Sequence, residues 1–269
     1  MNTASYQAYH SYLSEHVITP FYQVRLNNLN ELHLNSVLKR KNPYLFKAKN
    51  IELAGDLVKS IVDAFLSSQE ETIFGNLLEG FAIYVSKTLY RGIKSELKSV
   101  DLEFKRKGIY HIVSIKSGTS WGNSDQVNKM RDNFKLARTA LKERGIRKEI
   151  VAVNGCIYGK DRVPFKTHTD PDKQYFKYAG QDFWNFISQD DQLYREIIVP
   201  IDQEARQKDE AFKKAYAAKV NEMTQQFTNS FMTADNQIDW LKLIDFVSQR
   251  EDGKPTRSTP KARARIPTS

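Results

Sequence analysis

The chain has a single cysteine, Cys156, among its 269 residues. An internal disulfide and a cysteine-rich zinc site are therefore excluded, and the apolar run before Cys156 predicts a buried, inert thiol. Long apolar runs are also missing, since no stretch reaches the roughly 18 residues of a membrane-spanning helix. Residues 1–12 lack the apolar segment of a secretory signal. We expect a soluble, cytoplasmic protein with no membrane partner.

Acidic residues are fewer than basic ones, 32 Asp and Glu against 41 Lys and Arg, which gives a net charge of +9. This excess favours a polyanionic partner, with nucleic acid ahead of a membrane surface. Five basic residues and no acid follow Gly253, so the preceding residues carry only +4, which is +9 less five. Because this C-terminal stretch also lacks apolar periodicity, we expect a disordered tail that adds non-specific affinity.

Apolar periodicity is helical at both ends of the chain and alternates as in strands in the middle. Strands are expected near residues 100–104 and 110–115, joined by a basic turn, with a third strand over 148–158 and a loop over 161–177. The expected helices cover residues 4–38, with Pro20 interrupting or opening a segment, and then 53–67, 70–89, 126–144, a segment from 178, 203–227 and 239–248.

These elements suggest four segments along the chain. They are a helical and basic N-terminal segment (1–50), a core (51–200), C-terminal helices of the same globular unit (201–252) and the tail (253–269).

Three charged residues fall at the ends of the central elements. Glu79 lies on the helix over 70–89, Asp101 opens the first strand and Lys116 ends the second. Pairing of the two strands would bring Asp101 and Lys116 to one end of the sheet. A carboxylate there suits Mg²⁺, and a lysine positions or deprotonates an attacking water or stabilises the developing charge. The pattern therefore suggests phosphodiester hydrolysis.

Asp101 followed by the strand Ser114-Ile115-Lys116-Ser117-Gly118 resembles the core of PD-(D/E)XK nucleases, more specifically that of type II restriction endonucleases. The helix segment over 74–79 and the Tyr178-Ala179-Gly180 segment also resemble elements of these enzymes, and the similarity covers roughly residues 40 to 245. The resemblance implies an α/β restriction-endonuclease-like fold: a central mixed sheet flanked by helices, with a helical C-terminal part.

The chain departs from the family pattern at two positions. Val100 replaces the proline before the aspartate, and Ser114 stands where the second acid normally lies. A serine hydroxyl is a poor Mg²⁺ ligand compared with a carboxylate. Glu79 is the favoured source of the second carboxylate and Glu103 the alternative, while the family pattern adds the carbonyl oxygen of Ile115. The expected catalytic residues are Asp101, Lys116, Ser114 and Glu79, and the expected metal ligands are Asp101, Glu79 and Ile115.

DNA contacts are expected from basic and amide side chains around this core. The basic turn lies in the hairpin, and we expect it beside Asp101 and Lys116. The candidates for base recognition are the polar loop over 119–125, the helix that follows it and the segment over 160–173. The basic and aromatic stretch over 39–49 either contacts phosphates or is a solvated loop whose aromatics pack on the core. The expected contacts are Lys39, Arg40, Lys41, Lys105, Arg106, Lys107, Ser120, Asn123, Gln126, Asn128, Lys129 and Arg131.

The resemblance implies Mg²⁺-dependent, sequence-specific cleavage of double-stranded DNA by a homodimer, with a cognate DNA methyltransferase as functional companion. Two-fold symmetry would match a palindromic site, and the apolar stripe from Phe212 to Phe227 is the expected dimer contact. Two alternatives stay open. One is another nuclease with the same core, acting in repair or junction resolution. The other, suggested by Ser114, is a sequence-specific DNA-binding protein without catalysis.

Overall fold

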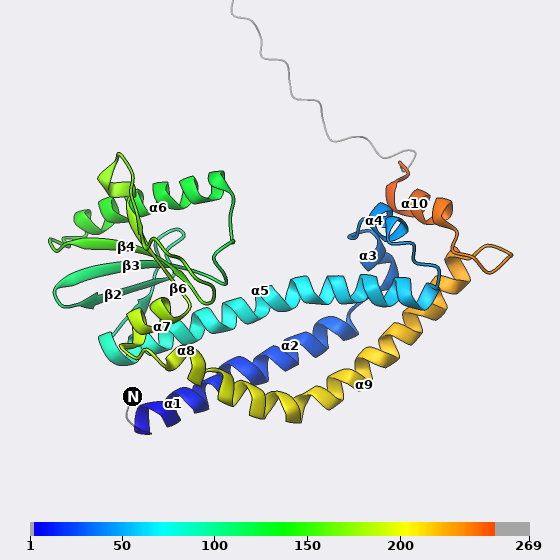
Figure 1. Cartoon of the computed structure of the whole chain (residues 1–269), viewed down its shortest axis with the longest axis horizontal. Coiled ribbons are helices and arrows are strands. Elements are labelled where there is room, and N and C mark those ends of the chain that lie inside the picture. The colour runs from blue at the N-terminus through cyan, green and yellow to red at the C-terminus, as the bar shows by residue number, and fades with distance from the viewer. Residues whose placement is uncertain (1–2, 251–269) are drawn as a thin grey trace, which may run out of the picture. The chain divides into compact units, whose positions relative to one another are not determined.

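The computed structural model describes the backbone of residues 3–250, with their side chains except those of residues 3–5, 203 and 207. The chain divides into two compact units, which we describe separately: Met1–Leu32 with Asp63–Lys219, and His33–Val62 with Val220–Ser269. Figure 1 labels the helices and strands. The tail predicted over 253–269 lies outside the described residues. No helix within residues 3–250 is long and apolar enough to span a membrane.

The first unit contains a mixed six-stranded sheet in the order β1-β2-β3-β4-β6-β5. Strand β3 pairs in parallel with β4, and β4 pairs in parallel with β6, whereas the three remaining pairs are antiparallel. The strands are β1 (Ile93–Lys94), β2 (Leu102–Arg106), β3 (Ile109–Lys116), β4 (Ile150–Cys156), β5 (Phe165–Lys166) and β6 (Tyr175–Ala179).

Helices cover both faces of this sheet. Helix α6 (Ser124–Glu143) packs Phe134 and Leu141 against Ile112 on one face. The other face is covered by α1 (Thr3–Leu13), the C-terminal part of α5 (Ala54–Tyr90) and α7 (Gln181–Ser188). Figure 1 shows α6 and α7 on opposite sides of the strands. The predicted α/β class, a mixed sheet flanked by helices, is confirmed.

The hairpin that carries Asp101 and Lys116 forms as predicted. Strand β2 pairs antiparallel with β3, and Leu102 lies opposite Val113. The turn residues Lys107 and Gly108 have φ values of 49° and 85°, which is the backbone that two-residue hairpin turns require. Alternation places Leu102 and Val113 in the core on the α5 face, and therefore leaves Asp101 and Ser114 on the α6 face.

Three further helical segments complete the first unit. A π-helical segment (Ser14–Ile18) follows α1, and α2 (Thr19–Asn30) begins with Pro20 in its first turn. Pro20 thus lies at the start of α2, as one of the two alternatives expected, although the helical backbone continues unbroken through the π-helical residues before it. A short α8 (Leu193–Glu196) precedes the first turns of α9 (Ile198–Phe231).

The second unit consists of helices. It contains α3 (Leu34–Leu38), α4 (Pro43–Ala48), α10 (Trp240–Ser248) and the adjoining turns of α5 and α9. The stretch over 39–49 is thus largely helical, because Asn42 caps α4 and accepts hydrogen bonds from the backbone N–H groups of Tyr44 and Leu45. Phe46 is buried as one alternative expected, whereas Tyr44 is 60% exposed.

Three predictions about the elements are wrong. The break expected at Ser67 and Ser68 does not exist, since α5 is continuous from Ala54 to Tyr90. Serine is accommodated inside a helix, and here the hydroxyl of Thr72 bonds back to the Ser68 carbonyl oxygen. The loop expected over 161–177 contains β5, a 3₁₀ turn (Pro171–Lys173) and most of β6, and the following helix begins at Gln181 rather than at residue 178.

The predicted dimer stripe is also corrected. Phe212, Met223 and Phe227 are at most 5% exposed within the single chain. Arg25 lies 3.5 Å above the ring of Phe212 in the first unit, and Phe227 packs on Phe231 in the second. These apolar side chains form intramolecular core, which leaves them no surface for a second copy.

Candidate active site

The adjacent ends of β2 and β3 bring Asp101 and Lys116 together. Asp101 precedes β2, and its Oδ2 accepts a hydrogen bond of 2.6 Å from the backbone N–H of Ile115. Lys116 ends β3, and its Nζ lies 3.8 Å from the same Oδ2 and donates to the Ile115 carbonyl oxygen at 2.8 Å. Both side chains are part-exposed, 31% for Lys116 and 22% for Asp101, so a substrate can reach the pair.

Glu79 joins this pair from α5. Burial raises the pKa of its carboxyl, the negative charge of Asp101 raises it further, and Lys94 and Lys116 act in the opposite direction. Gly75 lies one turn earlier on the same helix face, and a Cβ placed there would come within 2.4 Å of the Ser117 hydroxyl. The glycine therefore lets α5 approach the end of β3 closely, which positions Glu79.

Ser114 does not face solvent. Its side chain is fully buried, and its hydroxyl has no hydrogen-bond partner among the described residues. Glu103, the alternative second acid, is only 3% exposed. Its carboxylate accepts hydrogen bonds from the Ser95 hydroxyl at 2.6 Å and the Tyr110 hydroxyl at 2.7 Å. Glu79 is therefore the better placed of the two carboxylates to act with Asp101.

The oxygens at this strand end suit a hard divalent cation. Asp101 and Glu79 supply carboxylates and Ile115 a carbonyl, the ligand types that Mg²⁺ takes together with water. Burial is the main cause of the raised pKa of Glu79, and the negative charge of Asp101 adds to it, an effect that a bound cation would offset. Within residues 3–250 no group of three His, Cys, Asp or Glu side chains is arranged to hold a metal.

The basic hairpin turn lies away from this site. Arg106 and Ile109 pair at the turn end of the hairpin, whereas Asp101 and Lys116 lie at the other end. Five residues of strand separate them by roughly 17 Å, so the expectation that the turn lies beside the site is wrong. Lys105 and Lys107 are exposed, but Arg106 donates to the Phe186 carbonyl oxygen and stacks on its ring.

The loop after Lys116 leads into a capped helix. Asn123 and Gln126 form a reciprocal capping box at the start of α6, so both amide side chains already have structural partners. Ser120, Asn128 and Lys129 are exposed. The Arg131 guanidinium donates to the Thr167 carbonyl oxygen at 3.2 Å, which ties α6 to the segment over 160–173.

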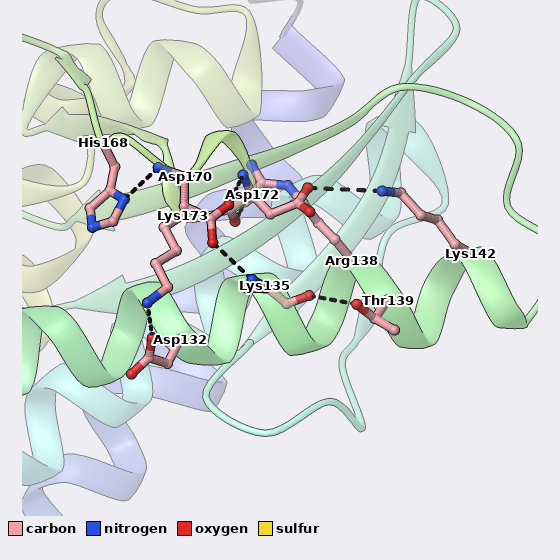
Figure 2. Close-up of polar contacts among 9 residues, drawn as sticks. All are labelled: Asp132, Lys135, Arg138, Thr139, Lys142, His168, Asp170, Asp172 and Lys173. Atoms are coloured by element: carbon pink, nitrogen blue, oxygen red, sulfur yellow. Dashed lines mark hydrogen bonds and ion pairs between the residues drawn. The ribbon is translucent and has the colours of Figure 1, made fainter.

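More contacts between this segment and α6 appear in Figure 2. Lys135 pairs with Asp170 at 2.8 Å, and Lys173 pairs with Asp132 at 2.7 Å. The buried Arg138 donates to the carbonyl oxygens of Ile150, Asp172 and Gln174. The two segments predicted for base recognition are therefore held against one another.

Lys39, Arg40 and Lys41 belong to the second unit. Lys39 and Arg40 are exposed, and the ammonium of Lys39 lies 5.2 Å from the ring centroid of Phe246.

The sequence also predicted an inert thiol at the single cysteine. Cys156 is fully buried, and burial raises the pKa of its thiol to about 11, as expected of an inert cysteine.

Two residues beside the site were not predicted individually from the sequence. Trp121 lies in a polar loop, and its ring centroid is 5.7 Å from the Nζ of Lys116. Asn154 lies inside an apolar strand, fully buried, opposite Ser114. A polar residue within an apolar run was the only available indication of Asn154.

Comparison with known proteins agrees with this geometry. The model of a protein family described as type II restriction endonuclease EcoO109I matches residues 9–209, about three quarters of the chain. No curated protein matches the sequence. The family match spans the whole sheet and all the residues around Asp101, so the chain belongs to the EcoO109I family of type II restriction endonucleases.

Proposed function

We propose that this protein is a type II restriction endonuclease that makes Mg²⁺-dependent, sequence-specific double-strand breaks in DNA by phosphodiester hydrolysis. Family membership implies a nuclease that acts on DNA. The observation that carries the proposal is the proximity of Asp101 and Lys116 at one end of the β2–β3 hairpin, with Glu79 on α5 close enough for their charges to affect its pKa.

Each residue has a distinct role in the proposed reaction. Asp101, Glu79 and the Ile115 carbonyl would hold Mg²⁺, which polarises the scissile phosphate when bound. Lys116 has three donor hydrogens, and Asp101 and Ile115 are the partners of its Nζ at this strand end. A further N–H is left to orient the attacking water or to stabilise charge on the phosphate. Ser114 packs the strand and supplies no ligand.

DNA would be held by the exposed side chains around the site. We propose Ser120, Asn128 and Lys129 for the groove near the reacting phosphate, and Lys105 and Lys107 for phosphates farther along the duplex. Two copies related by a two-fold axis would cut both strands of a palindromic site, and a cognate methyltransferase would protect host DNA.

The test is incubation of the purified protein with phage DNA, with and without Mg²⁺. Discrete fragments that require Mg²⁺ support the proposal. A smear or structure-selective nicking would indicate a repair or junction nuclease, and binding without cutting in both Mg²⁺ and Mn²⁺ would indicate a DNA-binding protein without catalysis.

Variants test the residue assignments. Lys116→Ala and Asp101→Ala should each lower the cleavage rate by at least about 100-fold, because each removes charge stabilisation at the reacting phosphate. Lys213→Ala is the matched control, since Lys213 also pairs with an aspartate, Asp209, at 2.8 Å in the first unit. Cleavage that survives either substitution at Lys116 or Asp101 would overturn the assignment.

A further inference from the structure

A polar bridge crosses the sheet beside Lys116. The indole N–H of Trp121 donates to Asn154 Oδ1 at 3.1 Å, and the Asn154 Nδ2 donates to the Ser114 carbonyl oxygen at 3.1 Å. Asn154 is fully buried and lies opposite Ser114 in the parallel β3–β4 pair. Its side-chain amide is thus fixed on both sides, which orients the Oδ1 toward Trp121.

Trp121 contacts the catalytic strand at a second point. Its ring centroid lies 5.7 Å from the Nζ of Lys116, within the range of a cation–π contact. The loop that carries Trp121 is anchored at both ends: Lys177 donates to the Thr119 carbonyl oxygen at 3.0 Å, and Asn123 caps α6. The indole is therefore held in place independently of Lys116.

A lysine side chain has four rotatable bonds and loses rotamer entropy when it is held in one orientation. At the end of a strand, a part-exposed lysine would sample many orientations. The Trp121 ring and the Ile115 carbonyl oxygen limit these orientations, so that the ammonium stays beside Asp101.

We propose that Trp121 and Asn154 are positioning residues for Lys116. Asn154 fixes the indole against β3, and the indole ring keeps the Lys116 ammonium in place for the reaction. This inference rests on the proposed nuclease function for its effect on cleavage, but the restraint on Lys116 is measurable without DNA.

The first variant is Trp121→Phe, which keeps an aromatic ring and removes the N–H donor. We expect the single-turnover cleavage rate to fall about 10-fold, because the loss of one hydrogen bond between neutral groups corresponds to a factor of about this size. Trp121→Leu removes the ring as well and should lower the rate about 100-fold. DNA affinity measured in Ca²⁺ should stay close to wild type, and the thermal midpoint should fall only modestly, because the buried Asn154 loses one donor.

Trp240→Phe is the matched control. Trp240 also has a lysine, Lys47, over its ring at 5.2 Å, but lies in the second unit. Asn154→Ala provides a second route to the same result, since it removes the side-chain acceptor and leaves Trp121 intact. Its cleavage rate should fall as in Trp121→Phe.

A double-mutant comparison separates positioning from general damage. If Trp121 acts through Lys116, Trp121→Leu in a Lys116→Arg background should lower the residual rate much less than in wild type. Equal losses in both backgrounds, or losses of affinity and thermal midpoint that match the loss of rate, would overturn the inference.

Labelling distinguishes failure of this inference from failure of the proposed function. The full-length protein is treated with an amine-reactive reagent, and mass spectrometry of its peptides measures the rate of acylation at Lys116. This rate should be several-fold higher in Trp121→Leu than in wild type or Trp240→Phe. Unchanged labelling overturns the positioning role. Faster labelling in a protein that cuts no DNA upholds it and overturns the nuclease proposal instead.

Discussion

At the residue scale, burial raises the pKa of the Glu79 carboxyl, and the nearby negative charge of Asp101 raises it further. A buried carboxylate beside a second acid costs stability that a bound cation would offset. Glu79→Gln removes this charge and a proposed Mg²⁺ ligand. We therefore expect its thermal midpoint in EDTA to equal or exceed that of wild type.

Addition of MgCl₂ should raise the midpoint of Glu79→Gln by less than about half of the wild-type rise, because stabilisation follows ligand affinity. Differential scanning calorimetry measures both values without DNA. Glu71→Gln is the control, since Glu71 is exposed on the same helix. A full Mg²⁺ response in Glu79→Gln would remove Glu79 from the metal site.

His111 gives a second prediction at this scale. It is 5% exposed and stacks on Phe104 with ring centroids 4.8 Å apart. Burial and the positive charge of Arg106 lower its pKa from 6.5 to about 4. The neutral form is favoured in the fold, so its contribution is complete above the unfolded pKa of about 6.5 and is lost as the pH falls toward 4.

His111→Phe keeps an aromatic ring and removes this titration. Between pH 7 and pH 4.5 the free energy of unfolding of wild type should fall by about 2 kcal/mol more than that of the variant. Urea denaturation at several pH values tests this. His16→Phe is the control, because His16 is exposed and stacks on Tyr12; the same result in both variants would contradict the prediction.

At the element scale, α6 is joined to the segment over 168–173 by exposed ion pairs and by Arg138, as Figure 2 shows. The ion pairs contribute little because water screens them. Arg138 differs, since it is 8% exposed and burial lowers the pKa of its guanidinium. Its fork geometry allows donation to three carbonyl oxygens on two elements.

Arg138→Met should lower the free energy of unfolding by about 3 kcal/mol, because buried carbonyl oxygens lose their donors. Urea denaturation measures the change. Arg147→Met is the control, because Arg147 is exposed and donates only one described hydrogen bond, to the Lys142 carbonyl oxygen at 3.4 Å. A loss for Arg138→Met no larger than that of the control would show that the ion pairs, rather than Arg138, hold the two elements together.

At the scale of the whole molecule, more than half of the net charge of +9 comes from the five basic residues after Gly253. Basic residues of this kind raise the affinity for DNA of any sequence and do not distinguish one sequence from another. Removal of residues 254–269 should make the slope of log affinity against log salt concentration shallower by at most about 4.5, which is about 0.9 for each of the five basic residues. The preference for a specific site over random DNA should change little.

Equilibrium binding in Ca²⁺ over a range of salt concentrations measures this slope. A full-length variant with glutamine at the five basic positions separates charge from length. If the truncated protein loses its site preference while the glutamine variant keeps it, the tail contributes something other than charge.

Much of the nuclease core was predictable because its signals are local. The alternation in β2 and β3 and the turn at Lys107 and Gly108 specify a hairpin, and the hairpin alone brings Asp101 and Lys116 to one end. Helix α6 was also predictable, from its periodicity and the glycine that follows it. Strand β6 was not, because five residues with mixed polarity become a strand only by pairing with β4.

The sequence by itself determined the hairpin, the residue types of the site and the family resemblance, since these depend on neighbours in the chain. The sequence favoured Glu79 over Glu103 as the proposed second acid beside Asp101, but only the tertiary structure supplies the physical reason. Glu103 is nearer in sequence, but Ser95 and Tyr110 bind its carboxylate, whereas Gly75 allows α5 to bring Glu79 to the site. The same holds for Trp121 and Asn154, whose contact joins residues 33 positions apart. Such contacts depend on how elements pack, which no local pattern encodes.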